Sequence, residues 1–495
     1  MGVVKKQSVK ASVITYIGVL IGVINVFIIF PYFLTKEQIG LIKSLEAIAL
    51  IIVPFIYIGF PHAVNKFFPV YKESDFSRYK SGMTYLFIIM AINTLIAIAV
   101  FFLLKDYILS LFNDKSPLLS KYILFVIPIF IGISWFSIFF GISTSNLKIV
   151  LPRFLERILL RILQMAIVLL FYFSFISESS MVIYIALSYL IIMGLQYLYV
   201  KRQGMLEFDY KHFIKNKIVH DEEKHYVGLL TLSTISDSLI SNIGVVIIGT
   251  MLGLEYAAIF FIAYYMGYIL EVPATNFSLI LKPVLADSLE KGDYQNVLKL
   301  YKKSSLLQTI ISGFLFVLLF ANINEIFSIM PNGANFTEGK WVVIIISLGF
   351  VIKNMAGCHF DILTMSKHYR YSVAVTIIMA ILTCISFVLS ITFFGFLGAA
   401  IASVTTIILH SFLVVVIVYK LLKIMPIDKK TLQLGIVLLS IFVLSIFLPS
   451  LQNFYLSILY KSILLVSIYL PIIYLLVISE DINQQVNRIL NIFKK

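Results

Sequence analysis

A stripe of polar side chains interrupts the apolar segment 255–281. Its members follow one another at intervals of three or four residues, which places them on one face of an α-helix. They are Tyr264, Tyr268, Glu271, Thr275, Ser278 and Lys282. Tyrosine rings can stack on sugar rings, a lysine ammonium attracts phosphate as a point charge, and Pro273 should kink the helix midway. The stripe indicates either a cavity wall or a helix–helix seam in which neighbouring side chains satisfy the polar groups.

Lys353 is a cation near the middle of the apolar segment 339–365. A charge at that depth in a membrane is costly, so it faces a cavity or an opposite charge rather than lipid. We expect Lys353 to be a cavity cation; the alternative is a structural partner for a carboxylate such as Asp361 or Glu271. Asp361 lies eight residues further on, about 12 Å along a helix, so a direct Lys353–Asp361 pair is not expected.

Lys66 and Lys282 take near-equivalent places in two related parts of the chain. His62 and Lys66 share a helix face with Gly59 at the end of the apolar segment 44–65. Two such cations near one mouth of a cavity would suit a dianionic pyrophosphate. The alternative is that each lysine extends its ammonium to the membrane–water interface.

Asp237, Arg157 and Arg161 complete the set of candidate residues. Asp237 lies among small hydroxyl side chains in the segment 226–251, which either line a cavity or promote close helix packing. Arg157 and Arg161 lie at the start of the segment 158–176, where they either bind lipid phosphate or fix the topology. We find no zinc-ligand spacing and no Walker A motif, and we expect no catalytic residue, metal or cofactor.

The elements that carry these residues are membrane spans. Of the 495 residues, 60% are hydrophobic and only 13% are charged. Soluble chains have about 25% charged residues, whereas a spanning helix needs about 20 mostly apolar residues. The net charge of +14 is dispersed over short loops, so we attribute it to membrane topology rather than to nucleic-acid binding.

The apolar segments predict fourteen transmembrane helices. The first runs from Ala11 to Leu34, and the others fall at about 44–65, 82–104, 122–142, 158–176, 180–200, 226–251, 255–281, 305–327, 339–365, 371–394, 397–419, 431–449 and 456–478. With both termini in the cytoplasm, most Lys and Arg fall on the cytoplasmic side, as the positive-inside rule requires. The outer loops then hold only Lys36, Lys43, Lys105, Lys115, Lys121, Lys340 and Lys461.

Two halves of the chain share a weak internal repeat. Asp75 and Asp293 are 218 residues apart, and Lys66 and Lys282 are 216 apart. An offset of six helices gives both halves the same orientation and places a transport site between them. We expect an N-terminal six-helix bundle at 1–205, a cytoplasmic linker at 206–224, a second bundle at 225–422 and an additional helix pair at 423–495.

The loop residues carry a resemblance to a known family. The run Leu34-Thr35-Lys36-Glu37-Gln38-Ile39-Gly40 resembles the "LGPEEYG" turn after the first helix of Wzx-type bacterial polysaccharide flippases. The run from Phe277 to Asp287, followed by Lys291-Gly292-Asp293, resembles their "PVLSRLYAEGD" stretch. This family belongs to the multidrug/oligosaccharidyl-lipid/polysaccharide (MOP) exporter superfamily. The resemblance implies an all-α fold with two six-helix bundles in a V-shaped, MATE-like arrangement.

The resemblance also implies a function. It predicts a flippase in the bacterial plasma (inner) membrane that moves undecaprenyl-diphosphate-linked oligosaccharide outward by alternating access, for O-antigen, lipopolysaccharide or other surface polysaccharide biosynthesis. Its expected partners are membrane lipid, the lipid-linked oligosaccharide, a polysaccharide polymerase and a chain-length regulator, with no nucleic acid. The alternatives are a cation-coupled multidrug exporter of the same superfamily and a lipid II or teichoic-acid-type flippase. The outer loops contain no paired acidic motif, so we do not expect an enzyme.

Overall fold

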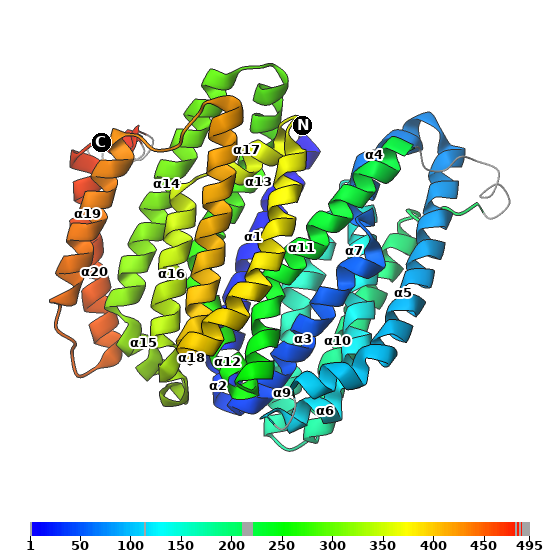
Figure 1. The fold of residues 1–495 in the computed structure, drawn as a ribbon, viewed down its shortest axis with the longest axis horizontal. Helices are drawn as coiled ribbons and strands as arrows, with labels where there is room; N and C mark the ends of the chain where they lie inside the picture. The colour runs from blue at the N-terminus through cyan, green and yellow to red at the C-terminus, as the bar shows by residue number, and fades with distance from the viewer. Residues whose placement is uncertain (1, 113–114, 210–220, 481–482, 485–486, 488–495) are drawn as a thin grey trace. The chain divides into compact units, whose positions relative to one another are not determined.

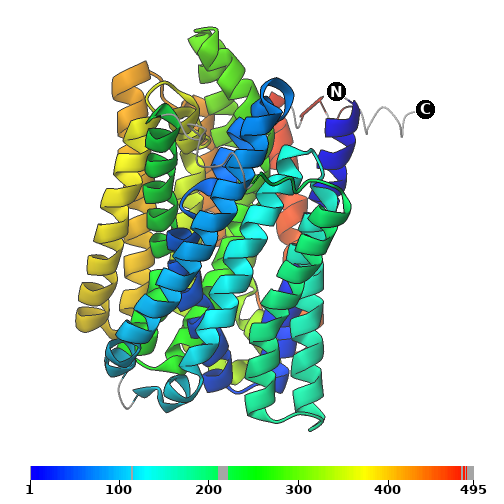
Figure 2. The same cartoon turned by 90° about the vertical axis from the view of Figure 1, so that its right-hand side faces the viewer.

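The computed structural model describes residues 2–112, 115–209, 221–480, 483, 484 and 487. Every regular element in these residues is a helix, which confirms the predicted fold class. The chain divides into two compact units, Met1–Ala258 and Ile259–Lys495. We refer to them as unit 1 and unit 2. Within each unit the long helices run roughly parallel to one another (Figures 1 and 2).

Unit 1 contains the first seven predicted spans and the start of the eighth. Its helices are α1 (Gly2–Ile24), α2 (Phe30–Phe33), α3 (Lys36–Tyr57), α4 (Phe60–Ser74), α5 (Phe76–Phe112), α6 (Pro117–Tyr122), α7 (Val126–Ser145), α8 (Val150–Phe154), α9 (Leu160–Tyr172), α10 (Glu178–Arg202) and α11 (Asp221–Met251). Two π-helical turns, Asn25–Ile29 and Leu155–Leu159, join α1 to α2 and α8 to α9. Helix α12 (Leu254–Tyr268) crosses the boundary between the units.

Unit 2 contains the remaining helices. They are α13 (Val272–Glu290), α14 (Tyr294–Ala321), α15 (Ile323–Ile329), α16 (Lys340–Met355), α17 (His359–Met365), α18 (Tyr369–Leu422), α19 (Lys429–Ile446) and α20 (Phe454–Leu475). The boundary after Ala258 differs from the predicted linker at 206–224, of which residues 210–220 lie outside the described residues. The division into functional bundles at that linker stays a prediction.

The helices of the described residues account for fourteen spans. Twelve are long and apolar enough to cross a membrane. The continuous helical stretch 150–172 adds one, since it is about 35 Å long. Helix α18 has 54 residues, or about 81 Å, against a hydrocarbon core of about 30 Å. It breaks at Gly395, where φ is 58° and ψ is −138°, so it forms the two spans predicted at 371–394 and 397–419 (yellow and orange in Figure 1).

The second span begins earlier than predicted and breaks in the middle. Thr35 caps α3 through a capping box with Gln38, so the helix starts at Lys36 rather than near residue 44. Lys43 therefore lies inside a helix, and its assignment to an outer loop was wrong. Ile58 and Gly59 have φ values of 42° and 62°, which ends α3 and redirects the chain into α4.

The eighth span also changes its geometry, where Pro273 was predicted to kink it. The α-helical pattern of α12 gives way to a 3₁₀ turn at Ile269–Glu271, and α13 follows with Pro273 in its first turn. Proline has no N–H to donate to the preceding turn, which explains the interruption there. The irregular turn ends at Glu271, a residue of the polar stripe.

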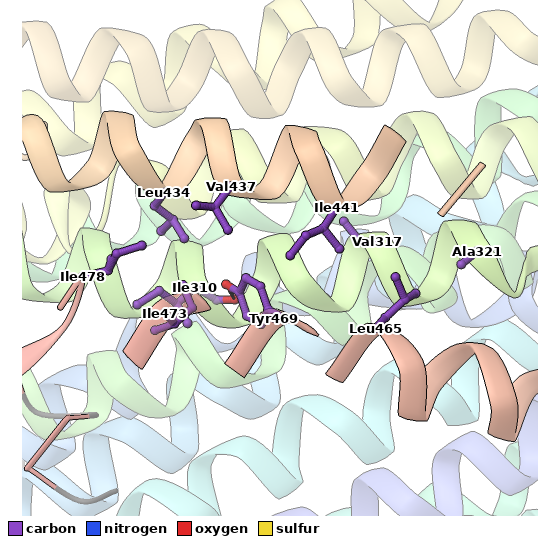
Figure 3. Packing of buried hydrophobic residues seen from close by; sticks show 10 residues of the cluster. All are labelled: Ile310, Val317, Ala321, Leu434, Val437, Ile441, Leu465, Tyr469, Ile473 and Ile478. Atoms are coloured by element: carbon purple, nitrogen blue, oxygen red, sulfur yellow. Dashed lines mark hydrogen bonds between the residues drawn. The ribbon is translucent and has the colours of Figure 1, made fainter. Parts of the chain in front are cut away.

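The C-terminal helix pair is fixed to the rest of unit 2. A buried cluster joins α14, α19 and α20, and Figure 3 shows its side chains meeting between these helices. Tyr469 of α20 stacks on Phe314 with 4.3 Å between ring centroids. Its hydroxyl donates a hydrogen bond to the carbonyl of Ile310 at 2.9 Å. These contacts make α19 and α20 part of the body of unit 2.

Candidate functional site

Lys353 and Glu271 form an ion pair in unit 2. Nζ of Lys353, on α16, lies 2.6 Å from Oε1 of Glu271, which ends the 3₁₀ turn. The pair corresponds to the alternative predicted from the sequence, in which Lys353 is the partner of a carboxylate. The lysine side chain is 34% exposed and the glutamate side chain only 8%. Among the described residues, Oε2 of Glu271 is buried without a hydrogen-bond partner.

Aromatic and amide groups hold the elements around this pair. Asn354 donates a hydrogen bond to the carbonyl of Leu270 at 3.2 Å, which ties α16 to the 3₁₀ turn. The ring of Phe350 lies 6.0 Å from the ammonium of Lys353 and packs edge-on against Tyr268 at 6.1 Å. A cation this close to a ring face is attracted by the ring quadrupole. The lysine is therefore held in place on one side by a carboxylate and on another by an aromatic ring.

A second pair joins the same two parts of unit 2. Nζ of Lys282, on α13, lies 3.4 Å from Oδ1 of Asp361, on α17. Again the lysine side chain is exposed (42%) and the carboxylate is buried (10%). Gly357, with φ 57°, makes the turn between α16 and α17, and a Cβ there would lie 2.7 Å from the backbone nitrogen of Ser305. Only glycine fits, and the turn brings Asp361 to Lys282 rather than to Lys353.

The polar stripe does not have one environment along its length. Tyr268 and Thr275 are exposed, whereas Glu271 is buried. Tyr264 is half-buried and packs edge-on against Phe350 with 5.9 Å between centroids. The role of the stripe as a cavity wall stays a prediction.

Unit 1 holds a buried charged network that sequence reasoning missed. Lys43 and Glu46 of α3 are 2.7 Å apart, and their side chains are 10% and 14% exposed. The hydroxyl of Tyr189, on α10, donates a hydrogen bond to Oε1 of Glu46 at 2.7 Å. Gln164 of α9 donates to the same oxygen at 3.4 Å and to the Tyr189 hydroxyl at 3.2 Å. The available signal was a lysine three residues before a glutamate on a capped apolar helix.

A cavity of about 460 Å³ opens beside this network, within unit 1. Its wall comes from α3, α4, α7, α8, α9 and α10 and from the π-helical turn at Leu155–Leu159. Its lining residues are Glu46, Leu50, Tyr57, Pro61, His62, Asn65, Gly132, Ile133, Phe136, Ser137, Phe140, Gly141, Arg153, Glu156, Leu160, Tyr189 and Ile192. Of the predicted site residues, only His62 lines it.

The other unit 1 candidates lie outside this lining. Lys66 lies over the ring of Tyr226 at 3.8 Å and that of Phe67 at 5.3 Å, so its ammonium contacts aromatic faces. Asp237 is exposed on α11. Lys66 and Lys282 therefore differ in partner, although the repeat gives them similar positions.

The two arginines connect the first and fifth spans. Arg161 donates a hydrogen bond to the carbonyl of Gly18, and its own carbonyl accepts one from Asn25 at 2.9 Å. Arg157 lies 3.4 Å from Glu156, and a Cβ on Gly18 would come within 2.7 Å of the Arg157 side chain. These contacts support the packing of α1 on the π-helical turn Leu155–Leu159 and on the start of α9. Within the described part of the chain, no three His, Cys, Asp or Glu side chains gather as metal ligands.

A fourth lysine–carboxylate pair is the most deeply buried of these. Lys461 of α20 lies 2.6 Å from Glu325 of α15, with side chains 5% and 2% exposed. The ammonium also donates to Ser450 and to the carbonyl of Ala321, both at 3.0 Å. Lys461 is therefore inside the protein, and its assignment to an outer loop was wrong. Lys461 lies near the start of the apolar segment 456–478, and its partner Glu325 is 136 residues away in the chain.

Comparison with known proteins identifies the fold. No family model matches the chain and no curated protein matches it. The solved structure of "Lipid II flippase MurJ, inward closed conformation" matches with a TM-score of 0.74 and 14% identity over 95% of this chain and 99% of that one. A multidrug resistance MATE transporter of the MOP superfamily, in an inward-facing conformation, gives 0.62 and 14% over 78% and 93%.

A Vibrio cholerae MATE transporter, VcmN in the bent form, gives 0.55 and 12% over 86% and 98%. These similarities confirm the predicted MATE-like fold: the chain has the fold shared by the MurJ flippase and the MATE transporters. It is a multi-pass membrane protein.

Proposed function

We propose that the chain is a flippase that carries a polyprenyl-diphosphate-linked oligosaccharide across the bacterial plasma membrane by alternating access. Its fold is that of membrane transporters and flippases, and the MurJ structure matches nearly the full length of both chains. In this proposal both termini are cytoplasmic, and a polysaccharide polymerase with its chain-length regulator uses the product.

The asymmetry of the two ion pairs in unit 2 carries the proposal. In both pairs the lysine is the exposed member and the carboxylate the buried one. An ammonium in a membrane protein does not face acyl chains, so Lys353 and Lys282 face water or a polar ligand. The carboxylates behind them neutralise the lysines in the absence of ligand and fix their positions. This arrangement presents cations to an anion that approaches from the open side.

The spacing of the pairs suggests how a diphosphate moves. Glu271 and Lys282 are eleven residues apart, about 16 Å along α13. A diphosphate group is shorter than this distance, so it contacts one lysine at a time. In the predicted topology Lys282 lies nearer the cytoplasm and Lys353 nearer mid-membrane. The lysines would therefore bind the diphosphate in succession.

The same observation bears on the alternatives. A cation-coupled drug exporter needs a carboxylate that is free to bind a cation. Glu271, Asp361, Glu46 and Glu325 each bind a lysine, which leaves Asp237, on α11, as the candidate for that alternative. The match to MurJ favours lipid II as a second candidate substrate. Both flippase substrates carry a diphosphate, so they differ in the glycan and not at the lysines.

Transport by the purified protein in proteoliposomes tests the proposal. The probes are a fluorescent undecaprenyl-diphosphate-linked oligosaccharide, the same lipid with the diphosphate replaced by an uncharged linker, lipid II, and the cationic dye ethidium. We expect flipping of a diphosphate lipid and none of the uncharged analogue. Proton- or sodium-driven movement of ethidium without lipid flipping would establish the drug exporter instead. Liposomes without protein provide the background rate.

A further inference from the structure

The cavity in unit 1 differs in chemistry from the lysine pairs of unit 2. Its volume of about 460 Å³ falls within the range of about 300–1,000 Å³ that small-ligand sites occupy. Both its polar and its apolar lining come from unit 1 alone. We propose that this cavity binds a neutral sugar residue of the transported glycan. The inference rests on the proposed function and adds to it a second subsite.

The charges that line the cavity are already neutralised. Glu46 is paired with Lys43 at 2.7 Å, and Arg153 with Glu156 at 3.2 Å. The three charged lining side chains are two carboxylates and one guanidinium, an excess of negative charge that disfavours a phosphate. Each carboxylate already binds a cation, so neither is free for a cationic drug. The cavity therefore suits an uncharged ligand.

The polar groups exclude a simple acyl chain. Glu46, the Tyr189 hydroxyl, Asn65 and the Arg153–Glu156 pair place both donors and acceptors on the wall. Each group has a partner within the protein, but a carboxylate, an amide and a guanidinium have further hydrogen-bonding positions, which a hydrocarbon would leave unsatisfied. A ligand rich in hydroxyl groups can both donate to them and accept from them.

Aromatic rings on the wall provide an apolar contact surface for a sugar. Phe136 and Phe140 lie one helical turn apart on α7, with 6.1 Å between their centroids. The guanidinium of Arg153 lies over the Phe140 ring at 4.9 Å. A pyranose has an apolar face of C–H groups that packs on such a ring, while its hydroxyl groups point to the polar wall. A ring sugar thus satisfies both sides of the cavity.

The backbone creates the space for this ligand. Helix α7 presents a stripe of wall residues at helical spacing: Gly132, Ile133, Phe136, Ser137, Phe140 and Gly141. The break at Ile58 and Gly59 redirects α4, so that His62 and Asn65 reach the wall. In the predicted topology these two residues and Arg153 lie at the cytoplasmic end, where the sugar would enter.

Protection of a cysteine on the wall tests the inference. In a protein with Cys358→Ser and Cys384→Ser, we introduce Ser137→Cys and, as a second reporter, Ile133→Cys, both half-buried on the wall. The rate of modification by a small water-soluble thiol reagent is measured with N-acetylglucosamine, galactose or rhamnose, each at millimolar concentration. Ser145→Cys, on the same helix but outside the lining, is the matched control.

We expect at least one ring sugar to slow modification at both wall positions and not at Ser145→Cys. A sugar at twice its dissociation constant should slow it about threefold, by mass action. Mannitol, an open-chain polyol, and inorganic pyrophosphate should have no effect. Phe140→Leu keeps an apolar side chain but removes the ring, and should weaken protection about two- to tenfold.

Other outcomes would overturn the inference. Absence of protection by every sugar, or wall cysteines that never react, would show that no sugar enters this cavity. Protection by pyrophosphate alone would make it an anion site, and protection by a straight-chain alcohol alone would make it a lipid site. Unchanged protection in Phe140→Leu would exclude the stacking contact. Lipid flipping is measured separately, so loss of sugar protection with intact flipping removes this subsite and leaves the proposed function standing.

Discussion

At the scale of single residues, the described part of the chain holds four lysine–carboxylate pairs whose carboxylate is largely buried. Lys353–Glu271 and Lys282–Asp361 have exposed cations, whereas Lys43–Glu46 and Lys461–Glu325 are buried on both sides. Burial of both members points to a structural role, because an enclosed ammonium cannot reach a ligand. Exposure of the lysine alone allows a ligand to compete with the carboxylate. The two kinds of pair therefore predict different mutant behaviour.

Lys461→Met should destabilise the protein without a specific effect on transport. Removing one partner of a buried ion pair costs about 3–5 kcal/mol, because the other charge is left unpaired. The melting temperature in detergent should fall, while flipping per folded molecule should stay near wild type. Adding Glu325→Leu should recover most of the stability. An unchanged melting temperature in Lys461→Met would contradict the role of this pair.

Lys353→Ala should lower the yield of folded protein, because it strands the carboxylate of Glu271. A buried polar group without its partner costs about 1–3 kcal/mol. Glu271→Gln in the same protein should restore the yield, since a neutral amide replaces the stranded charge. Size-exclusion chromatography of the detergent extract measures the folded fraction, with Lys340→Ala at the start of α16 as the control. A normal yield of Lys353→Ala alone would show that the pair has no structural role.

At the scale of elements, the breaks in the helices position the candidate residues. The turn at Gly357 brings Asp361 to Lys282, and the 3₁₀ turn before Pro273 brings Glu271 to Lys353. Proline and helical spacing made the break in the eighth span predictable from the sequence. The partners were not predictable, because they depend on which face of another helix packs against each residue.

The sequence predicted the spans better than the charges within them. Apolar length alone located both spans of α18, on either side of Gly395. The same rule assigned Lys43 and Lys461 to loops, because it treats a charge near the end of an apolar run as exposed. Both lysines are buried beside a carboxylate. Such pairing depends on tertiary contacts that hydropathy does not contain.

Gly395→Ala should destabilise the hairpin between the two halves of α18. A φ of 58° with a ψ of −138° is a conformation open essentially to glycine, and forcing another residue into it costs about 1–3 kcal/mol. The matched control is Gly194→Ala in α10, where a Cβ would meet nothing within 4 Å. The melting temperature should fall in the first variant and stay the same or rise in the second. Equal melting temperatures would argue against the strained turn.

At the scale of the whole molecule, fourteen helical spans with both ends on one side predict a definite topology. Reporter fusions after Lys224 and Lys303 should report the cytoplasm, and fusions near Glu178 and Asn335 the outside. The physical reason is the excess of Lys and Arg in the loops assigned to the cytoplasm. A cytoplasmic signal at Asn335 would contradict the fourteen-span arrangement.

The central claim is that Lys353 binds the diphosphate of the transported lipid, and flipping by the Lys353→Ala/Glu271→Gln double variant in proteoliposomes tests it most directly. This variant removes the cation without stranding its carboxylate, so a change in transport is not a change in folding. Loss of one charge-assisted hydrogen bond of about 1.5–3 kcal/mol should slow flipping of the diphosphate lipid about ten- to hundredfold. Lys353→Arg, which keeps the charge with a different geometry, should retain part of the rate. Flipping at the wild-type rate by a stably folded double variant would contradict the claim.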